Sequence, residues 1–513
     1  MFCSVRFRTM SSTTSPARSF WYENKMTDKT FIESDREQLA QREINPQEAQ
    51  RQLDLLRRGK AFLSIDRPCT VNDGITRLTE TAPIEFCRAF AEDRQRFTRF
   101  VPASGAASRM FQGLFPGEFD PDKVAQLRNN IEQFPFYSDL AALTGDKPDA
   151  TDDETLFRLM LSDDGLGLAS KPKGLLPLHR GEDYNRTAFA EHLHESSRLG
   201  ITRFHFTVSP DHLELFEKEL EKVKSNLEAG DDIEVSFSLQ SPGTDTIALD
   251  QSTDGPFRNT DNDLLFRPAG HGALLQNLEN CRGDLVLIRN IDNVVPKRLQ
   301  EPYQFWTEIL GGMLLKTQQQ VFTWLRKLES NPDNQTLVLA GQFLQERFGR
   351  SVDSTLPPEE LSGQLIGLLD RPIRVCGMVP VSGQPGGGPF WVRGDHEQQT
   401  PQIVEGVQID PDDLEQQKIL GESTHFNPVN IACSLRDRQG RPYKLDQFVD
   451  PQAAIITAKN HSGRDLLALE RPGLWNGAMA DWNTLFVEMP ETTFNPVKTV
   501  FDLLQSTHQP DHK

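Results

Sequence analysis

The sequence predicts an α/β fold built on a mainly parallel sheet. Residues 202–209 alternate as a strand, residues 211–227 form an amphipathic helix and residues 233–239 read as a second strand, which is the order of a parallel strand–helix–strand unit. A third apolar strand, residues 284–289, ends in Asn-Ile-Asp-Asn. Ligands of parallel sheets collect at the carboxyl ends of the strands, so the polar residues that follow these strands are the first candidates for a site.

Composition narrows the class of partner. The chain has 513 residues, enough for two or three structural units. Its 74 acidic residues outnumber its 55 Lys and Arg, and a net charge of −19 argues against a general nucleic-acid-binding surface. Six cysteines without Cys-x-x-Cys spacing favour reduced thiols and a cytoplasmic protein. No stretch approaches the roughly 20 apolar residues of a membrane span, so no membrane partner is expected.

The N-terminal part divides into two regions. Residues 1–28 are predicted to be a disordered tail or a leader, because the first 25 residues are rich in Ser, Thr and Arg. Met26 begins a more ordinary sequence and could equally be the start; we favour a tail. Residues 29–95 follow as a helical region, with a helix over residues 75–90, and its periodic apolar residues predict packing on the core.

The stretch at residues 99–111 is the first candidate site. A buried strand end is followed by Pro-Ala-Ser-Gly-Ala-Ala, and Ser108 is placed to cap a helix that begins at Arg109. Small side chains let backbone N–H groups approach a phosphate, and Arg109 adds a cation. The alternative is an ordinary strand-to-helix turn. The residues expected to bind nucleotide here are Ser104, Gly105, Ala106 and Ser108.

A second stretch, residues 171–178, places two lysines before an apolar run that reads as a short strand. Together the two stretches resemble the nucleotidyltransferases that make nucleotide sugars, whose signature is Gly-x-Gly-Thr-Arg-Met followed by Pro-Lys-x-Leu-Leu-Pro. Residues 172–177 match in full and include Lys173, whereas residues 105–110 carry Ala107 for the second glycine and Ser for Thr. Alanine would strain this loop by about 1 kcal/mol if the position required a positive φ.

The loop after residues 233–239 extends the resemblance. In nucleotide-sugar pyrophosphorylases a Gln at the end of a core strand meets the nucleobase and a Gly-Thr pair follows. Gln240, Gly243 and Thr244 occupy comparable places. A Gln amide offers a donor and an acceptor to a uracil or guanine edge. The alternative for Gln240 is a solvated loop residue.

A Gly-His-Gly block, a helix, an apolar strand and Asn-Ile-Asp-Asn follow in that order. This series resembles the eukaryotic-type UDP-sugar pyrophosphorylases. The resemblance implies that Gly270, His271 and Gly272 pass close to the nucleoside and that Asp292 holds a metal ion, with Mg²⁺ expected. The alternative for Asp292 is a helix cap.

Polar groups later in the chain are candidates for the sugar phosphate. A glycine-rich hairpin at residues 381–392 permits close approach to a ligand, and Trp391 could support a sugar face. By contrast, His192 and His194 are two apart on a predicted helix and do not share a face, which argues against a metal pair. Lys459 and Lys498 are also candidates, and each could instead lie on the surface. The candidates are Asn293, Lys459, Asn476, Asn495 and Lys498.

The chain also resembles, over residues 30–505, an uncharacterised family of bacterial proteins that supplies no activity. The resemblances together imply a GT-A/Rossmann-like nucleotidyltransferase core with an N-terminal helical cap and helical insertions. The nucleotide-binding half would span residues 96–300, with an inserted helical segment at residues 112–170. A second helical insertion at residues 301–369, a sugar-phosphate half at residues 370–505 and a tail at residues 506–513 would follow.

The implied reaction joins a nucleoside triphosphate, with UTP favoured, to a sugar 1-phosphate and releases pyrophosphate. Arg109 and Lys173 would be catalytic. Two alternatives stay open. A GT-A-type glycosyltransferase would consume a nucleotide sugar, but its usual metal motif has two aspartates flanking one residue, and residues 290–292 hold one. A non-catalytic nucleotide-sugar-binding protein is suggested by Ala107. The sequence does not predict the sugar or the oligomeric state.

Overall fold

The computed structural model describes residues 30–60, 62–79, 81–181, 184–227, 232–381, 386–394 and 398–510. The predicted tail or leader, residues 1–28, lies outside this part, as do residues 382–385 of the glycine-rich hairpin. No helix of the described residues is long and apolar enough to cross a bilayer.

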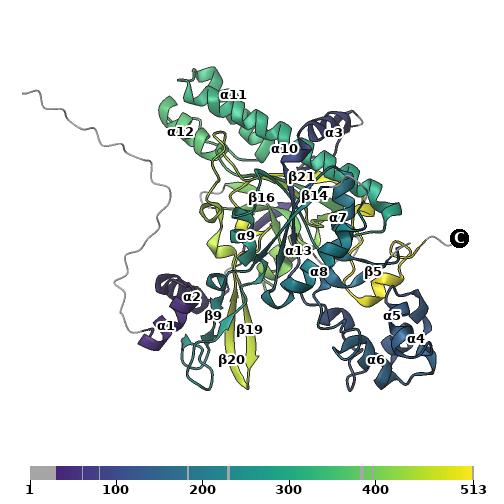
Figure 1. Ribbon diagram of the computed structural model, residues 1–513. Coiled ribbons are helices and arrows are strands. Elements are labelled where there is room, and N and C mark those ends of the chain that lie inside the picture. The colour runs from purple at the N-terminus through teal and green to yellow at the C-terminus, as the bar shows by residue number, and fades with distance from the viewer. Residues whose placement is uncertain are drawn as a thin grey trace, which may run out of the picture.

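A ten-stranded sheet runs through the centre of the molecule (Figure 1). All neighbouring strands in it are parallel except those that pair with β18 and the short β17, so the predicted mainly parallel α/β fold is confirmed. In spatial order the strands are β2 (Thr70–Val71), β3 (Gly74–Thr76), β21 (Asn483–Glu488), β14 (Ile373–Pro380), β18 (Asn430–Ser434), β13 (Leu285–Arg289), β4 (Phe97–Pro102), β7 (Arg203–Val208) and β8 (Glu234–Leu239), with β17 (His425–Phe426) paired to β14.

Helices cover both faces of this sheet because its central strands are apolar on both sides. In β13, Leu285 and Leu287 pack with the long helix α10, whereas Val286 and Ile288 pack with the short helix α9 on the other face. The described helices are α1 (Glu33–Gln41), α2 (Pro46–Arg58), α3 (Ala82–Asp93), α4 (Pro121–Asn129), α5 (Tyr137–Leu143), α6 (Asp153–Leu161), α7 (Ala188–Arg198), α8 (Leu213–Lys224), α9 (Leu275–Glu279), α10 (Gln300–Glu329), α11 (Asn334–Phe348), α12 (Pro358–Leu369) and α13 (Leu414–Gly421).

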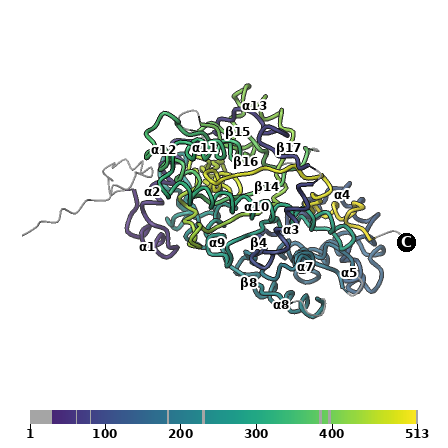
Figure 2. The backbone as a smooth tube through the Cα atoms, turned by 90° about the horizontal axis from the view of Figure 1, so that it is seen from above, coloured from purple at the N-terminus to yellow at the C-terminus, as the bar shows by residue number. Residues whose placement is uncertain are grey.

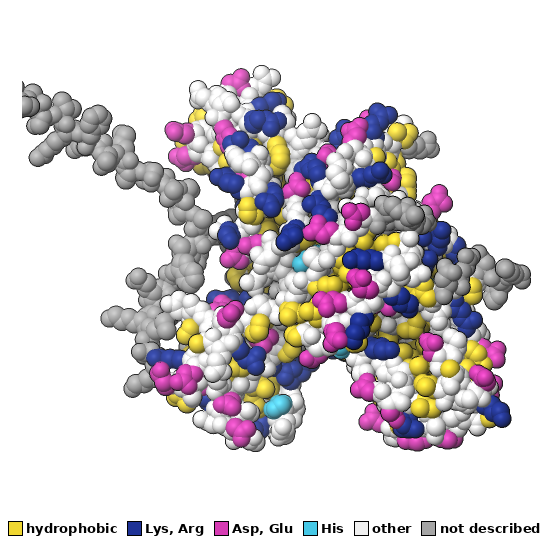
Figure 3. Space-filling view, viewed as in Figure 1, with side chains coloured by type: hydrophobic (Ala, Val, Ile, Leu, Met, Phe, Trp, Pro, Cys, Tyr) yellow, Lys and Arg dark blue, Asp and Glu magenta, His cyan; other side chains and the backbone are white. Residues whose placement is uncertain are grey.

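Two lobes extend from one side of the sheet. One holds α1, α2 and the β19–β20 hairpin, the other holds α4, α5 and α6, and the space-filling surface is hollowed between them (Figures 1 and 3).

The smaller sheets are β1 (Ile65–Pro68) with β15 (Gly388–Arg393) and β16 (Gln399–Val404); β11 (Gly255–Pro256) with β10 (Leu249–Asp250), β20 (Arg464–Glu470) and β19 (Ile455–His461); β12 (Phe266–Arg267) with β9 (Thr246–Ile247); and β5 (Pro177–His179) with β6 (Arg186–Thr187).

Two local predictions were wrong. The helix expected to begin at Arg109 is a single 3₁₀ turn, Ser108–Phe111, with Ala107 in the capping place. It ends because Gly113 adopts φ +86°, which turns the chain away. The helix expected over residues 75–90 starts only at α3, because residues 74–76 join the sheet beside β21.

Candidate functional site

The carboxyl ends of four parallel strands form one rim of the sheet. Phe100 of β4 pairs with Ile288 of β13 on one side and with His205 of β7 on the other, and His205 pairs with Ser236 of β8. Because these strands run the same way, the segments that follow them emerge at the same edge. These are the segments that hold the predicted phosphate loop, Gln240 and Asp292.

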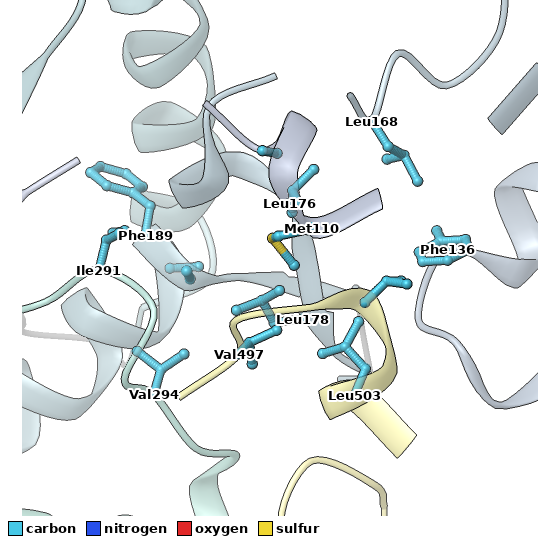
Figure 4. Packing of buried hydrophobic residues seen from close by; sticks show 14 of the residues in the cluster. Met110, Phe136, Leu168, Leu176, Leu178, Phe189, Ile291, Val294, Val497 and Leu503 are labelled. Atoms are coloured by element: carbon cyan, nitrogen blue, oxygen red, sulfur yellow. The ribbon is translucent and has the colours of Figure 1, made fainter. Parts of the chain in front are cut away.

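An apolar cluster draws the candidate segments together beneath the rim (Figure 4). Met110, Leu176, Ile291 and Val497 are buried in it, and each lies within three residues of a predicted polar site residue. Figures 1 and 2 show that the C-terminal segment, far along the chain, lies beside α4 and α5. Burial of these side chains therefore determines that their polar neighbours meet.

The small-residue loop is joined to the lysine stretch by backbone hydrogen bonds. Ala107 N donates to Lys171 O at 3.2 Å, and Lys173 N donates to Gly105 O at 2.9 Å. Ala107 has φ −83° and ψ −11°, a conformation that alanine adopts without strain. Alanine, which stands here in place of the motif's second glycine, is therefore compatible with the conformation of the loop. Arg109 and Gly105 are exposed.

Lys173 and Lys498 converge on one carboxylate. The Lys173 ammonium lies 2.8 Å from Asp292 Oδ2, and the Lys498 ammonium lies 2.9 Å from the same oxygen. Lys498 is held close because Val497 N donates to the Asp292 carbonyl at 3.0 Å. Asp292 Oδ1 is buried and has no hydrogen-bond partner among the described residues.

This trio carries a net charge of +1 in a largely desolvated place. The side chains of Asp292 and Lys173 are 9% and 14% exposed, whereas that of Lys498 is 49% exposed. Burial lowers the pKa of Lys173, and Asp292 offsets only part of that effect. Burial alone would raise the pKa of Asp292, but the two ammoniums outweigh it and hold the pKa below its ordinary value.

One carboxylate oxygen of this arrangement is free to coordinate a divalent cation. No group of three His, Cys, Asp or Glu among the residues that the structure describes could hold a metal by itself. Mg²⁺, however, is commonly held by one or two carboxylates together with substrate phosphates and water. The unpartnered Oδ1 of Asp292 would be an oxygen ligand of that kind.

Asn293 and Asn495 bind protein groups in this structure. Asn293 is fully buried, and its Oδ1 accepts hydrogen bonds from Asn495 N at 3.0 Å and from the Tyr303 hydroxyl at 3.3 Å. Asn495 Nδ2 donates to the Tyr303 hydroxyl at 2.8 Å. Both amides thus fasten the C-terminal segment to the turn that carries Asp292, and contact with a sugar phosphate remains a prediction.

A second polar group surrounds His271. Its ring stacks on Trp475 with centroids 4.3 Å apart, and its Nδ1 accepts a hydrogen bond from Leu474 N at 3.0 Å. Its Nε2 lies 3.7 Å from Glu405 Oε1, which also accepts a hydrogen bond from Asn476 Nδ2 at 2.6 Å. Contact with His271 and then with the Asn476 amide lowers the pKa of Glu405.

Helix α9, which follows the Gly-His-Gly block, lies beside the end of β8. Asn277 of α9 donates to Ser238 Oγ at 2.8 Å and to Leu239 O at 2.9 Å, directly before the half-buried Gln240. A Cβ at Gly272 would lie 2.2 Å from Pro472 O, so only glycine allows this close approach. The helix that follows the Gly-His-Gly block therefore lies beside the predicted base contact.

The remaining candidates contact other parts of the chain or are exposed. Gly243 packs against the loop between α1 and α2, where a Cβ would lie 3.2 Å from Glu43 O. Arg471 Nε donates to the Thr244 carbonyl at 2.9 Å. Lys459 is exposed on β19, within the hairpin lobe of Figure 1.

Comparison with known proteins places the chain in a family. A family model described as a domain of unknown function, DUF4301, matches residues 32–509. The chain belongs to the DUF4301 family. No curated protein matches its sequence.

Solved structures similar to this DUF4301 protein include three trypanosomatid proteins. A UDP-glucose pyrophosphorylase variant from Leishmania major, in complex with UDP-glucose, is 13% identical with a TM-score of 0.42, covering 92% of this chain and 77% of that one. A UDP-glucose phosphorylase from Trypanosoma brucei is 13% identical with a TM-score of 0.46, covering 93% and 80%. The UDP-N-acetylglucosamine pyrophosphorylase from T. brucei, in complex with an inhibitor, is 13% identical with a TM-score of 0.46, covering 92% and 79%.

The candidate residues chosen from the sequence do not include Glu405, Trp475 or His192. Glu405 is an acidic residue directly after the buried end of β16, which is the signal that could have found it. Trp475 is adjacent in sequence to the predicted Asn476. His192 was excluded as a metal ligand on its spacing, and that argument says nothing of the carbonyl groups that it contacts.

Proposed function

We propose that the chain is a sugar-1-phosphate nucleotidyltransferase, which joins a nucleoside triphosphate to a sugar 1-phosphate and releases pyrophosphate. The convergence of Lys173 and Lys498 on one oxygen of Asp292 carries this proposal. Two ammoniums with a single counter-charge, one partly buried and one about half exposed, favour a multiply charged anion such as a phosphate chain. The motif resemblance of residues 105–110 and 172–177 supports nucleotide chemistry at the same place.

The reaction needs alignment and charge neutralisation more than a protein nucleophile. An oxygen of the sugar phosphate attacks the α-phosphorus, a new P–O bond forms, and the bond to the bridging oxygen breaks as pyrophosphate leaves with the electron pair. Lys173 and Lys498 would neutralise the reacting phosphates. Arg109 and the backbone amides of residues 104–106 would hold the departing pyrophosphate.

Asp292 Oδ1 would hold Mg²⁺, because Oδ2 is already shared by the two lysines. When bound, the cation would supply Lewis-acid neutralisation of phosphate oxygens. Residue 290 is Asn, so the turn has one aspartate, which favours the nucleotidyltransferase over the glycosyltransferase.

The base, the nucleoside and the sugar would each meet a different set of residues. Gln240 would pair with the base, with UTP the first candidate, and Gly243, Thr244 and the block of residues 270–272 would pass close to the nucleoside. Trp475, Glu405 and Asn476 would face the sugar, since an aromatic ring beside carboxylate and amide oxygens suits apolar sugar faces and hydroxyl groups.

A pyrophosphate-release assay across nucleoside triphosphates and sugar 1-phosphates, with Mg²⁺, tests the proposal. Wild type should release pyrophosphate with at least one pair, and Asp292→Asn should lower the rate on the order of 10²-fold or more. Asp333→Asn is the matched control, because Asn caps α11 as well as Asp does. Full activity in Asp292→Asn, or no release from any pair, would contradict the proposal. Transfer from a ready-made UDP-sugar would support the glycosyltransferase, and binding without turnover a sensor.

A further inference from the structure

The turn that carries Asp292 is held from below by a histidine of α7. His192 is buried, and its Nε2 lies 3.2 Å from Asn290 O and 3.3 Å from Ile291 O. Both partners are carbonyl acceptors, so Nε2 carries the proton and donates to both. These are the two peptide carbonyls directly before Asp292.

The imidazole of His192 is suited to donate its Nε2 hydrogen bond at any pH in the physiological range. Burial and the nearby guanidiniums of Arg289 and Arg99 hold the pKa of His192 well below its ordinary value. The ring therefore stays neutral, with its one proton on Nε2. Its Nδ1 is buried without a hydrogen-bond partner among the described residues.

Burying the unsatisfied Nδ1 of His192 costs free energy, and an apolar side chain at this position would avoid that cost. What the imidazole adds is the donor on Nε2. The other flank of the turn is fixed by Asn293, which accepts from Tyr303 and Asn495. Asp292 thus lies between two residues whose positions are set from opposite sides.

We propose that His192 is a positioning residue for the Asp292 carboxylate: by fixing the carbonyls of Asn290 and Ile291, it directs Oδ1 toward the place of the cation. This inference rests on the proposed function, in which Asp292 holds Mg²⁺ beside the nucleotide. Groups outside the ligand set that orient a metal ligand change metal affinity by about 10–100-fold when they are lost.

The test compares His192→Leu with His192→Gln. The Gln amide nitrogen can reach the place of Nε2 and donate, whereas Leu cannot. Binding of Mn²⁺ in the presence of UTP, followed by electron paramagnetic resonance, should weaken about 10–100-fold in His192→Leu and recover to within a few-fold of wild type in His192→Gln. In pyrophosphate release, kcat should fall in His192→Leu with a smaller change in the KM for the sugar phosphate.

His194 provides the matched control. It is buried on the same helix, and its Nε2 contacts the Tyr184 hydroxyl at 3.0 Å, away from the Asp292 turn. His194→Leu should lower the thermal midpoint without weakening Mn²⁺ binding. Should His192→Leu not fold, His192→Asn replaces it, because its shorter amide cannot reach both carbonyls.

The outcomes separate the two proposals. A wild-type protein that neither binds Mn²⁺ with UTP nor releases pyrophosphate overturns the proposed function and this inference with it. An active wild type in which His192→Leu and His192→Gln bind Mn²⁺ equally well overturns the inference alone. Equal weakening in His194→Leu also overturns it, because the effect would then be one of helix packing.

Discussion

Lys498 and Lys459 are the two lysines that the sequence offers as sugar-phosphate cations, and they differ in their surroundings. Lys498 contacts Asp292, whereas Lys459 is exposed on β19. We expect Lys498→Ala to lower kcat/KM for the sugar phosphate on the order of 10²-fold, because a cation at the reacting phosphates is lost. Lys459→Ala should change it less than two-fold. Steady-state pyrophosphate release measures both, and equal effects would contradict the assignment.

For single residues the sequence predicts best where a motif is present. Lys173 lies in a motif before β5 and Asp292 lies in one after β13, and the structure brings them together. Glu405 and His192 act through contacts with segments that are distant in the sequence. Neither residue lies in a recognisable motif, so periodicity and spacing could not have identified its partners.

Helix α7 and the strands beneath it share a buried ion cluster. Arg289 Nη1 donates to both oxygens of Glu195 at 2.6 and 2.8 Å, and Arg99 Nη2 lies 3.6 Å from the same carboxylate. Glu195→Gln would leave two buried guanidiniums without a counter-charge. We expect a loss of about 3–5 kcal/mol in the free energy of unfolding, measured by urea denaturation.

The control for this cluster is an ion pair in water. Glu214 and Lys218 pair at 2.7 Å on the exposed face of α8. Glu214→Gln should leave stability nearly unchanged, because solvent screens the pair. A Glu195→Gln protein as stable as wild type would show that the cluster does not hold α7 to the sheet.

The close contact between the Gly-His-Gly block and the segment around Pro472 can be tested by substitution. A Cβ at Gly272 would meet Pro472 O at 2.2 Å, so Gly272→Ala must displace the segment that carries Trp475 and Asn476. We expect the KM for the sugar phosphate to rise at least ten-fold. The control is Gly363→Ala in α12, where a Cβ meets nothing within 4 Å and alanine favours the helix by about 1 kcal/mol. Unchanged kinetics in Gly272→Ala would contradict the assigned sugar side.

The elements that the sequence predicts correctly are those with strong local periodicity. Strands β7, β8 and β13 and helix α8 match their predicted places within a few residues. The expected helix at Arg109 was wrong because a cap signal does not reveal the turn imposed by Gly113 four residues later.

At the scale of the molecule, strand order is the feature that the sequence does not predict. The antiparallel β18 separates β13 from β14, and β21, from the end of the chain, pairs with both β14 and β3. Such pairings join segments that are far apart in the sequence. Hydrophobic periodicity describes each strand alone, so it predicts a parallel sheet without its order.

Buried histidines make the whole fold sensitive to acid. Burial lowers the pKa of His205 to about 4, and burial together with His179 and Arg298 lowers that of His508 to about 3. An unfolded histidine titrates near pH 6.5, so between that pH and about 4 the unfolded chain binds more protons than the folded one, and stability falls as the pH falls.

Each of these two groups should reduce the free energy of unfolding by about 1.4 kcal/mol between pH 7.5 and 5.5, a window above the ordinary carboxylate range. Urea denaturation at the two pH values measures the loss. His205→Gln keeps an amide between Ser236 and Ser238 but cannot titrate, so it should lose stability less steeply than wild type. Identical pH dependence in the variant, or equal wild-type stability at both pH values, would show that these histidines are protonated in the fold.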